Sequence, residues 1–119
     1  MNQPEEFLRR PYSGPGRLEL EFREFHAENP EILSIVIREA LRAKFAGIEI
    51  GGIALVWERI RWLMTVETKS EDGFKLNNNH RAFYARLAMH VEPRLSDFFE
   101  VRVQRGADFD PATVPVQEV

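Results

Sequence analysis

Apolar residues recur three or four positions apart along four stretches of the chain, which is the spacing of an amphipathic α-helix. The first stretch is short and carries Leu18, Phe22 and Phe25 on one face. The second begins at Asn29–Pro30, because asparagine caps a helix well and proline suits its first position. It runs to Gly47, which accepts the left-handed turn that stops a helix.

The third and fourth stretches form a helix pair. The third follows Gly51–Gly52 and has a strongly apolar stripe, made of Ile53, Val56, Trp57, Ile60, Leu63 and Met64. The fourth runs from Asn79 to His90, after three asparagines that suit a helix start, and Pro93 ends it.

Strand patterns stand before, between and after these two helices. We predict short strands at Ile48–Ile50, Phe74–Leu76 and Phe99–Arg105, and a turn at Leu95–Phe98. A short strand before a helix pair and a strand after it are typical of a winged helix, with Phe74–Leu76 as an alternative wing. The predicted fold is therefore mainly α with short strands, winged-helix-like, with Asn79–His90 as the helix that reads a DNA groove.

The 119 residues, 44% of them apolar, suffice for one domain with a buried core. Proline and glycine interrupt residues 1–16, and proline among small and acidic residues marks 106–119. We therefore predict one domain over residues 17–105 between a flexible N-terminal segment and a flexible tail.

Composition narrows the classes of function. The absence of cysteine excludes disulfides and thiolate metal sites and fits a reducing, cytoplasmic setting. No apolar run approaches the length of a membrane span, so no membrane partner is expected. The formal net charge of −3 argues against a general polycation for nucleic acid, although a local basic face remains compatible with it.

Basic and amide side chains concentrate around the start of the fourth predicted helix. Arginine and asparagine hydrogen-bond guanine and adenine, and helix N-termini suit phosphate. We therefore predict a nucleic-acid site, made of Lys75, Asn77, Asn78, Asn79, His80, Arg81 and Arg86, with Arg59 and Arg61 as further phosphate contacts. The alternative is a capped helix with an ordinary solvated face.

Two further clusters have competing interpretations. Trp62 lies at the edge of the apolar stripe, where packing at the core edge is favoured over a role as an exposed partner anchor. His26, close to Phe22 and Phe25, is interpreted as a structural histidine.

The sequence gives little support for an enzyme active site. The three histidines have no metal-ligand spacing, and no glycine-rich phosphate loop or Gly-x-Ser-x-Gly elbow occurs. A carboxylate-x-lysine trace at Glu67–Lys69, with Glu58 upstream, resembles a nuclease motif, but the preceding residues have a helical pattern. We predict a protein without catalytic activity, metal or cofactor.

Five blocks in order carry a resemblance that spans about Phe22 to Arg102. They are Phe25–Pro30, Glu58–Trp62, Gly73–Asn79, Tyr84–Leu87 and Phe98–Arg102. As a set they are similar to a group of short uncharacterised proteins of phages, prophages and bacterial genomes. The resemblance implies a phage or mobile-element context, and with it DNA transactions, transcriptional control or interference with host defence. It identifies no catalytic residue.

Three functions follow as hypotheses. The first is duplex-DNA binding through Asn79–His90, with a homodimer or larger complex to reach useful affinity. The second is a protein-interaction module, such as a phage-encoded inhibitor or accessory factor, with Glu21, Glu24 and Trp62 as partner contacts. The third is a structural subunit, which an exposed Trp62 or Phe99 would favour.

Overall fold

The computed structural model describes residues 16–49, 51–67, 76–100 and 109–116, and most of them are helical. The four α-helices are α2 (Arg17–Glu28), α3 (Glu31–Phe45), α4 (Ile53–Trp62) and α5 (Arg81–Val91). A π-helical turn, η1 (Leu63–Glu67), continues α4. Three 3-10 turns, η2 (Asn78–His80), η3 (Pro93–Leu95) and η4 (Pro111–Thr113), complete the described elements. The four predicted helices are thereby confirmed.

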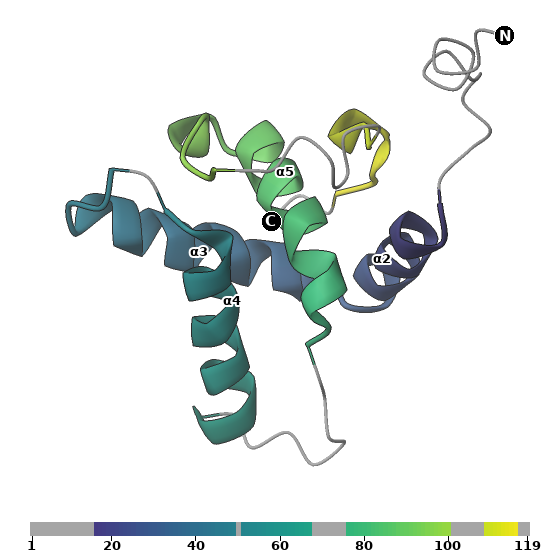
Figure 1. Ribbon diagram of the computed structural model, residues 1–119, viewed down its shortest axis with the longest axis horizontal. Helices are drawn as coiled ribbons and strands as arrows, with labels where there is room; N and C mark the ends of the chain where they lie inside the picture. The colour runs from purple at the N-terminus through teal and green to yellow at the C-terminus, as the bar shows by residue number, and fades with distance from the viewer. Residues whose placement is uncertain (1–15, 50, 68–75, 101–108, 117–119) are drawn as a thin grey trace, which may run out of the picture.

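Helix α5 lies at the centre of the arrangement. It contacts α3, α4 and the three 3-10 turns, and α3 crosses behind it in Figure 1 while α4 descends below α3. Tyr84 of α5 and Trp57 of α4 are fully buried, with ring centroids 5.6 Å apart. Phe22 of α2 is also fully buried and meets the Tyr84 ring edge-on at 4.8 Å. Aromatic packing of this kind joins three helices into one core.

The boundary between α2 and α3 differs in detail from the prediction. The Asn29 side chain donates to the Phe25 carbonyl oxygen at 3.0 Å, so it satisfies the end of α2 instead of capping α3. No side chain caps α3, whose flanking residue is Pro30. The predicted stop at Gly47 is confirmed, because Gly47 has a φ of 104° and the next amide, that of Ile48, returns to the Ala43 carbonyl.

The predicted strands leave one trace within the described residues. Gly51 and Phe99 form an isolated parallel bridge, in which the Gly51 amide donates to the Phe98 carbonyl oxygen at 2.9 Å. Ile48 and Glu49 are not in a strand, while Ile50, Phe74, Lys75 and residues 101–105 lie outside the described part. One bridge is no sheet, so the helical class is confirmed and the wing is not among the described elements.

Two residues of the C-terminal segment pack into the core. Phe109 and Val114 belong to the predicted flexible tail, yet both are buried in the core. Their burial removes apolar surface from water, which orders a stretch that carries no helical or strand periodicity.

Candidate functional site

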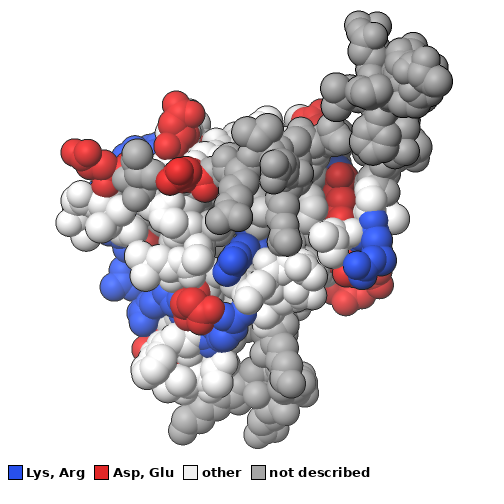
Figure 2. All heavy atoms as spheres, in the orientation of Figure 1, with Lys and Arg blue, Asp and Glu red and all other residues white. Residues whose placement is uncertain are grey.

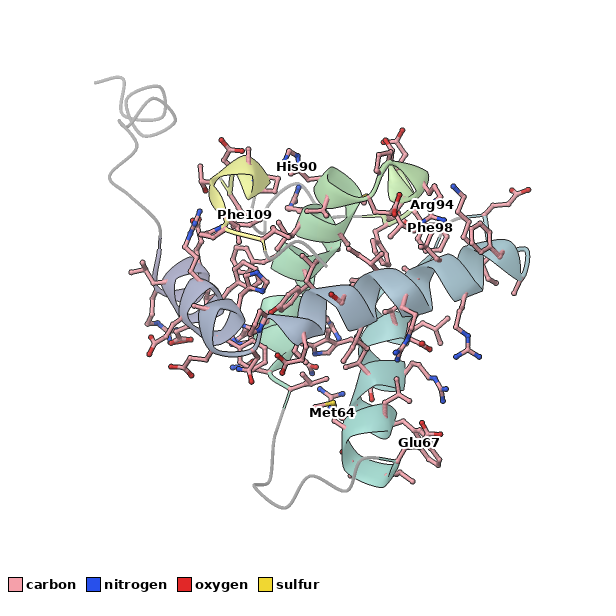
Figure 3. The ribbon with its side chains drawn as sticks, turned by 180° about the vertical axis from the view of Figure 1, so that it is seen from behind. Met64, Glu67, His90, Arg94, Phe98 and Phe109 are labelled. Carbon is pink, nitrogen blue, oxygen red and sulfur yellow. The ribbon has the colours of Figure 1, made fainter. Side chains whose placement is uncertain are left out.

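The helix expected to read DNA is largely enclosed. Of the residues of α5, only His90 is exposed, and Figure 3 shows this histidine near the end of the helix that lies furthest from α4. His80, at the start of this helix, is buried and stacks on Phe25 with ring centroids 4.8 Å apart. Burial lowers the pKa of His80 and so disfavours the charged form of its ring. A residue in this position cannot reach a base without leaving the core.

Some of the other residues predicted to bind nucleic acid make hydrogen bonds within the protein, and others are only half-buried. The Asn77 side chain accepts from the Asn79 amide at 2.8 Å, which is a capping contact. Arg61 donates to the Asn78 side-chain oxygen at 2.7 Å and to the Leu76 carbonyl at 3.1 Å. These contacts tie α4 to the start of η2. Arg81 and Arg86 are half-buried, and Lys75 lies outside the described residues.

A different set of arginines gathers on the face that α3 and α4 share. Glu39 of α3 is buried, and its carboxylate accepts from Nε of Arg38 at 3.0 Å and from Nε of Arg59 at 3.1 Å. Arg42 approaches the same carboxylate at 3.4 Å. Burial raises the pKa of Glu39, but the hydrogen bonds from Arg38 and Arg59 and the charge of Arg42 outweigh it, so the net pKa lies below its usual value. Two exposed guanidinium groups, those of Arg38 and Arg42, and the half-buried one of Arg59 thus share one buried carboxylate.

Beside these arginines, α4 exposes large apolar side chains. Leu55 is 63% exposed and Trp62 is 54% exposed. They lie four positions before and three positions after Arg59, so the three side chains share one helix face. Val66, 44% exposed, continues this face into the π-helical turn. We call Leu55, Arg59, Trp62, Arg38 and Arg42 the α3–α4 face.

Trp62 differs from its predicted position at the core edge. Trp57 is fully buried in the core. Trp62 follows five positions later on the same helix, which places it on a different face, away from the core. Exposed Trp62 is the condition that favoured a partner or assembly contact, whereas Phe99, the other residue considered for that role, is buried. In Figure 2, blue and uncharged side chains adjoin one another on α3 and α4, at the left below the level of α3.

The acidic residues predicted to contact a partner lie on α2, which stands apart from α4 at the right in Figure 1. Glu24 is exposed, and Glu21 pairs with Arg17 at 3.0 Å in an exposed ion pair. Such a pair contributes little to stability. Glu21 and Glu24 therefore form a surface separate from the α3–α4 face.

His26 has the structural role predicted for it. It is buried, with Nδ1 3.2 Å from the Tyr84 hydroxyl and Nε2 3.3 Å from the Pro115 carbonyl oxygen.

Within the described ranges, no group of three or more histidine, aspartate or glutamate side chains is placed to hold a metal ion. None of the described helices combines the length and apolar character that crossing a bilayer requires.

Comparison of the chain with protein-family models, with curated proteins and with solved structures finds no match. The function is therefore argued from the α3–α4 face itself.

Proposed function

We propose that this chain is a protein-interaction module that docks a partner on the α3–α4 face. The observation that carries the proposal is the exposure of Leu55 and Trp62 on either side of Arg59, on one face of α4. Tryptophan and arginine are the residue types that most often dominate the energy of protein interfaces. Helix α4 would present them from a rigid element, because Val56, Trp57 and Ile60 anchor its opposite side in the core.

The charges of the face define the chemistry of the partner. Arg38, Arg42 and Arg59 bring three positive charges to a single negative charge on Glu39. Each guanidinium has five N–H donors, and the hydrogen bonds to Glu39 use only part of them. A partner segment with apolar side chains between carboxylates would place the apolar groups on Leu55 and Trp62 and the carboxylates on the arginines.

The proposal is tested with a designed probe. A fluorescein-labelled peptide in which glutamates alternate with leucine and phenylalanine is titrated with the protein at low and near-physiological salt. We expect saturable binding that weakens as salt rises, since exposed charges are screened. Peptides with lysine in place of glutamate, or serine in place of the apolar residues, should bind at least about tenfold more weakly.

Matched variants separate the face from the rest of the surface. Trp62→Ala and Arg42→Glu should each weaken binding by about tenfold or more. Leu20→Ala and Arg17→Glu, which remove an exposed leucine and reverse an exposed arginine on α2, should leave the affinity unchanged. Equal binding by all four variants and the wild type would refute the proposal.

Binding of duplex DNA by a winged-helix-like domain is the second candidate. It is supported by the same three guanidinium groups, whose exposure suits phosphate contacts. The net charge of −3 and the exposed Leu55 and Trp62 favour the protein partner, because a phosphate backbone makes no use of apolar side chains. Labelled random-sequence duplex in the same titration decides: salt-sensitive binding that Arg42→Glu abolishes and Trp62→Ala leaves intact would support DNA.

The implied phage or mobile-element context is compatible with either candidate. For the protein partner it suggests an accessory factor or an inhibitor that docks on a host or phage protein. The surface of that partner should then be acidic and amphipathic.

A further inference from the structure

Residues 109–116 lie against α2 and α5 in the way that a bound peptide lies in a groove. The segment contains one 3-10 turn, η4, and is otherwise extended. Figure 3 shows Phe109 of this segment pointing toward the helices, and η4 contacts α5. Phe109 and Val114 are buried, whereas the residues around them are exposed or half-buried. Two apolar anchors on an otherwise solvated segment are characteristic of peptide recognition.

Phe109 enters an aromatic site formed by both helices. Its ring meets Phe22 of α2 edge-on at 5.6 Å and Phe83 of α5 edge-on at 5.2 Å. The Arg23 guanidinium carbon lies 5.5 Å from the centroid of the Phe109 ring. Edge-to-face packing and a cation over the ring both select an aromatic side chain at this position.

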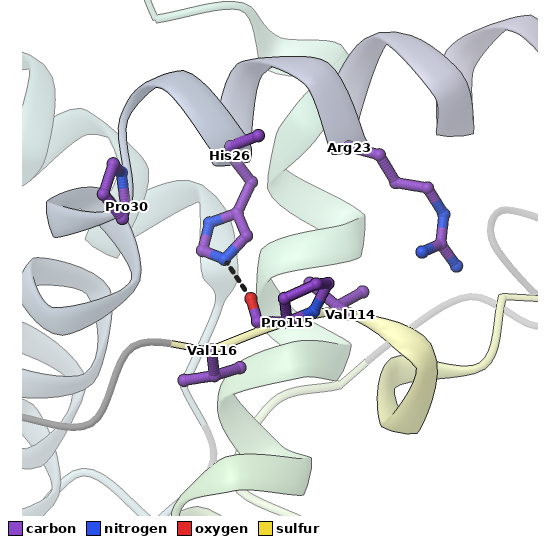
Figure 4. Close-up of a pocket in the computed structure, with 7 residues that line it drawn as sticks. Arg23, His26, Pro30, Val114, Pro115 and Val116 are labelled. Carbon is purple, nitrogen blue, oxygen red and sulfur yellow. Dashed lines mark hydrogen bonds between the residues drawn. The ribbon is translucent and has the colours of Figure 1, made fainter.

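Polar contacts fix the direction of the segment. Arg23 is held by Glu19 at 2.8 Å and donates to the Thr113 hydroxyl oxygen at 2.6 Å. Further along, His26 Nε2 meets the Pro115 carbonyl oxygen, as Figure 4 shows. A carbonyl oxygen can only accept, so Nε2 carries the proton and Nδ1 accepts from the Tyr84 hydroxyl.

The groove is larger than the segment that occupies it. A cavity of about 310 Å³ remains between α2 and the end of the segment, lined by Arg23, His26, Ala27, Pro30, Val114, Pro115 and Val116. Figure 4 shows Pro30 to the left of the His26 ring and Val116 below it. The lining is mainly apolar, so a larger apolar side chain at position 116 would gain buried surface here.

We propose that the groove between α2 and α5 is a peptide-binding site, which the chain's own segment Phe109–Val116 occupies in cis and which accepts the same segment from a second copy of the chain. The site recognises phenylalanine first, threonine four positions later, and then valine and proline. It is separate from the α3–α4 face, so neither proposal depends on the other.

The test measures the binding of the segment in trans. A fluorescein-labelled peptide of residues 109–116 is titrated with the full chain and with the full-chain variant Phe109→Ala. In the wild type the attached segment competes at an effective concentration of about millimolar. The variant loses the aromatic anchor of that competitor, so we expect it to bind the peptide at least about tenfold more tightly than the wild type does.

Controls test the recognition chemistry. The peptide that carries Phe109→Ala should not bind the Phe109→Ala protein measurably, and the peptide that carries Val116→Leu should bind more tightly than the native sequence. A second protein variant, Val114→Ser, weakens the other anchor and should also open the groove. Circular dichroism at equal concentration establishes that each variant is folded.

Two results would overturn the proposal. One is the absence of peptide binding to both variants while both remain helical. The other is the unfolding of both variants, because the segment would then be a necessary part of the folding core and not a docked ligand.

Discussion

Replacing Glu39 with glutamine tests the charge cluster that organises the α3–α4 face. The substitution keeps the shape of the side chain and removes one negative charge that three arginines share. The amide retains one acceptor oxygen, but its NH2 group donates, and it faces guanidinium groups that also only donate. We expect Glu39→Gln to destabilise the protein.

The size of the effect follows from the exposure of the partners. The Glu39 side chain is only 5% exposed, which on its own would indicate a costly loss, whereas the arginine side chains are 40% to 66% exposed and therefore screened by water. Exposed pairs contribute about 0.2–1 kcal/mol each, so three pairs predict a loss of about 1–2 kcal/mol. Urea unfolding followed by circular dichroism at pH 7 measures it.

The matched control is Glu21→Gln, which removes an exposed carboxylate that pairs with a single arginine, Arg17. Its free energy of unfolding should stay within about 0.5 kcal/mol of the wild type. Equal stability of Glu39→Gln and the wild type would refute the reasoning, because it would show that the three contacts contribute nothing.

The pH dependence gives the same prediction an independent check. Since the folded pKa of Glu39 lies below its usual value of 4.5, its contribution is complete above pH 4.5. It is lost as the pH falls from 4.5 through the folded pKa. The difference in stability between the wild type and Glu39→Gln should therefore shrink over that range.

The remaining predictions concern the core. Burial lowers the pKa of His26 and of His80 below the usual 6.5, so as the pH falls below 6.5 the unfolded chain binds protons first, and stability should fall by up to about 1.4 kcal/mol per pH unit for each ring. His80→Gln should flatten this dependence of stability on pH, whereas the control His90→Gln, at an exposed position, should not. Chemical unfolding between pH 7 and pH 5 measures the slope for each variant. Equal slopes for the two variants would contradict the role given to His80. A Cβ on Gly51 would overlap the Phe98 ring, whereas one on Gly52 meets nothing within 4 Å. Gly51→Ala should therefore cost about 1–3 kcal/mol and Gly52→Ala much less; similar melting temperatures for the two variants would count against the packing of Phe98 on Gly51.

The helices could be predicted because their signals are local. Apolar spacing and the stop at Gly47 are read within one or two turns, and the Asn77 cap lies directly before the turn that it supports. The central position of α5 could not be read in this way. Basic and amide residues gather around its start, which resembles a groove-reading helix. The burial of Ala85 and Ala88 depends instead on helices distant in the sequence, which no local pattern records.

The two surfaces proposed as sites illustrate the same limit. Trp62 stands at the edge of an apolar stripe, and only the placement of Trp57 in the core determines that Trp62 points outward. Phe109 and Val114 lie among prolines and small residues, a composition that is typical of a frayed tail. Their burial depends on Phe22 and Phe83, and no local periodicity records such a long-range contact.

The two tryptophans provide the most direct test of the α3–α4 face. Trp57 is fully buried and Trp62 is exposed, so their indole N–H signals in a nitrogen–proton correlation spectrum report on the core and on the face separately. The measurement is a titration of the labelled protein with the acidic apolar peptide, with Trp62→Phe to assign the signals. The account predicts that the Trp62 signal shifts while the Trp57 signal stays in place. A stationary Trp62 signal, with shifts confined to α2, would contradict it.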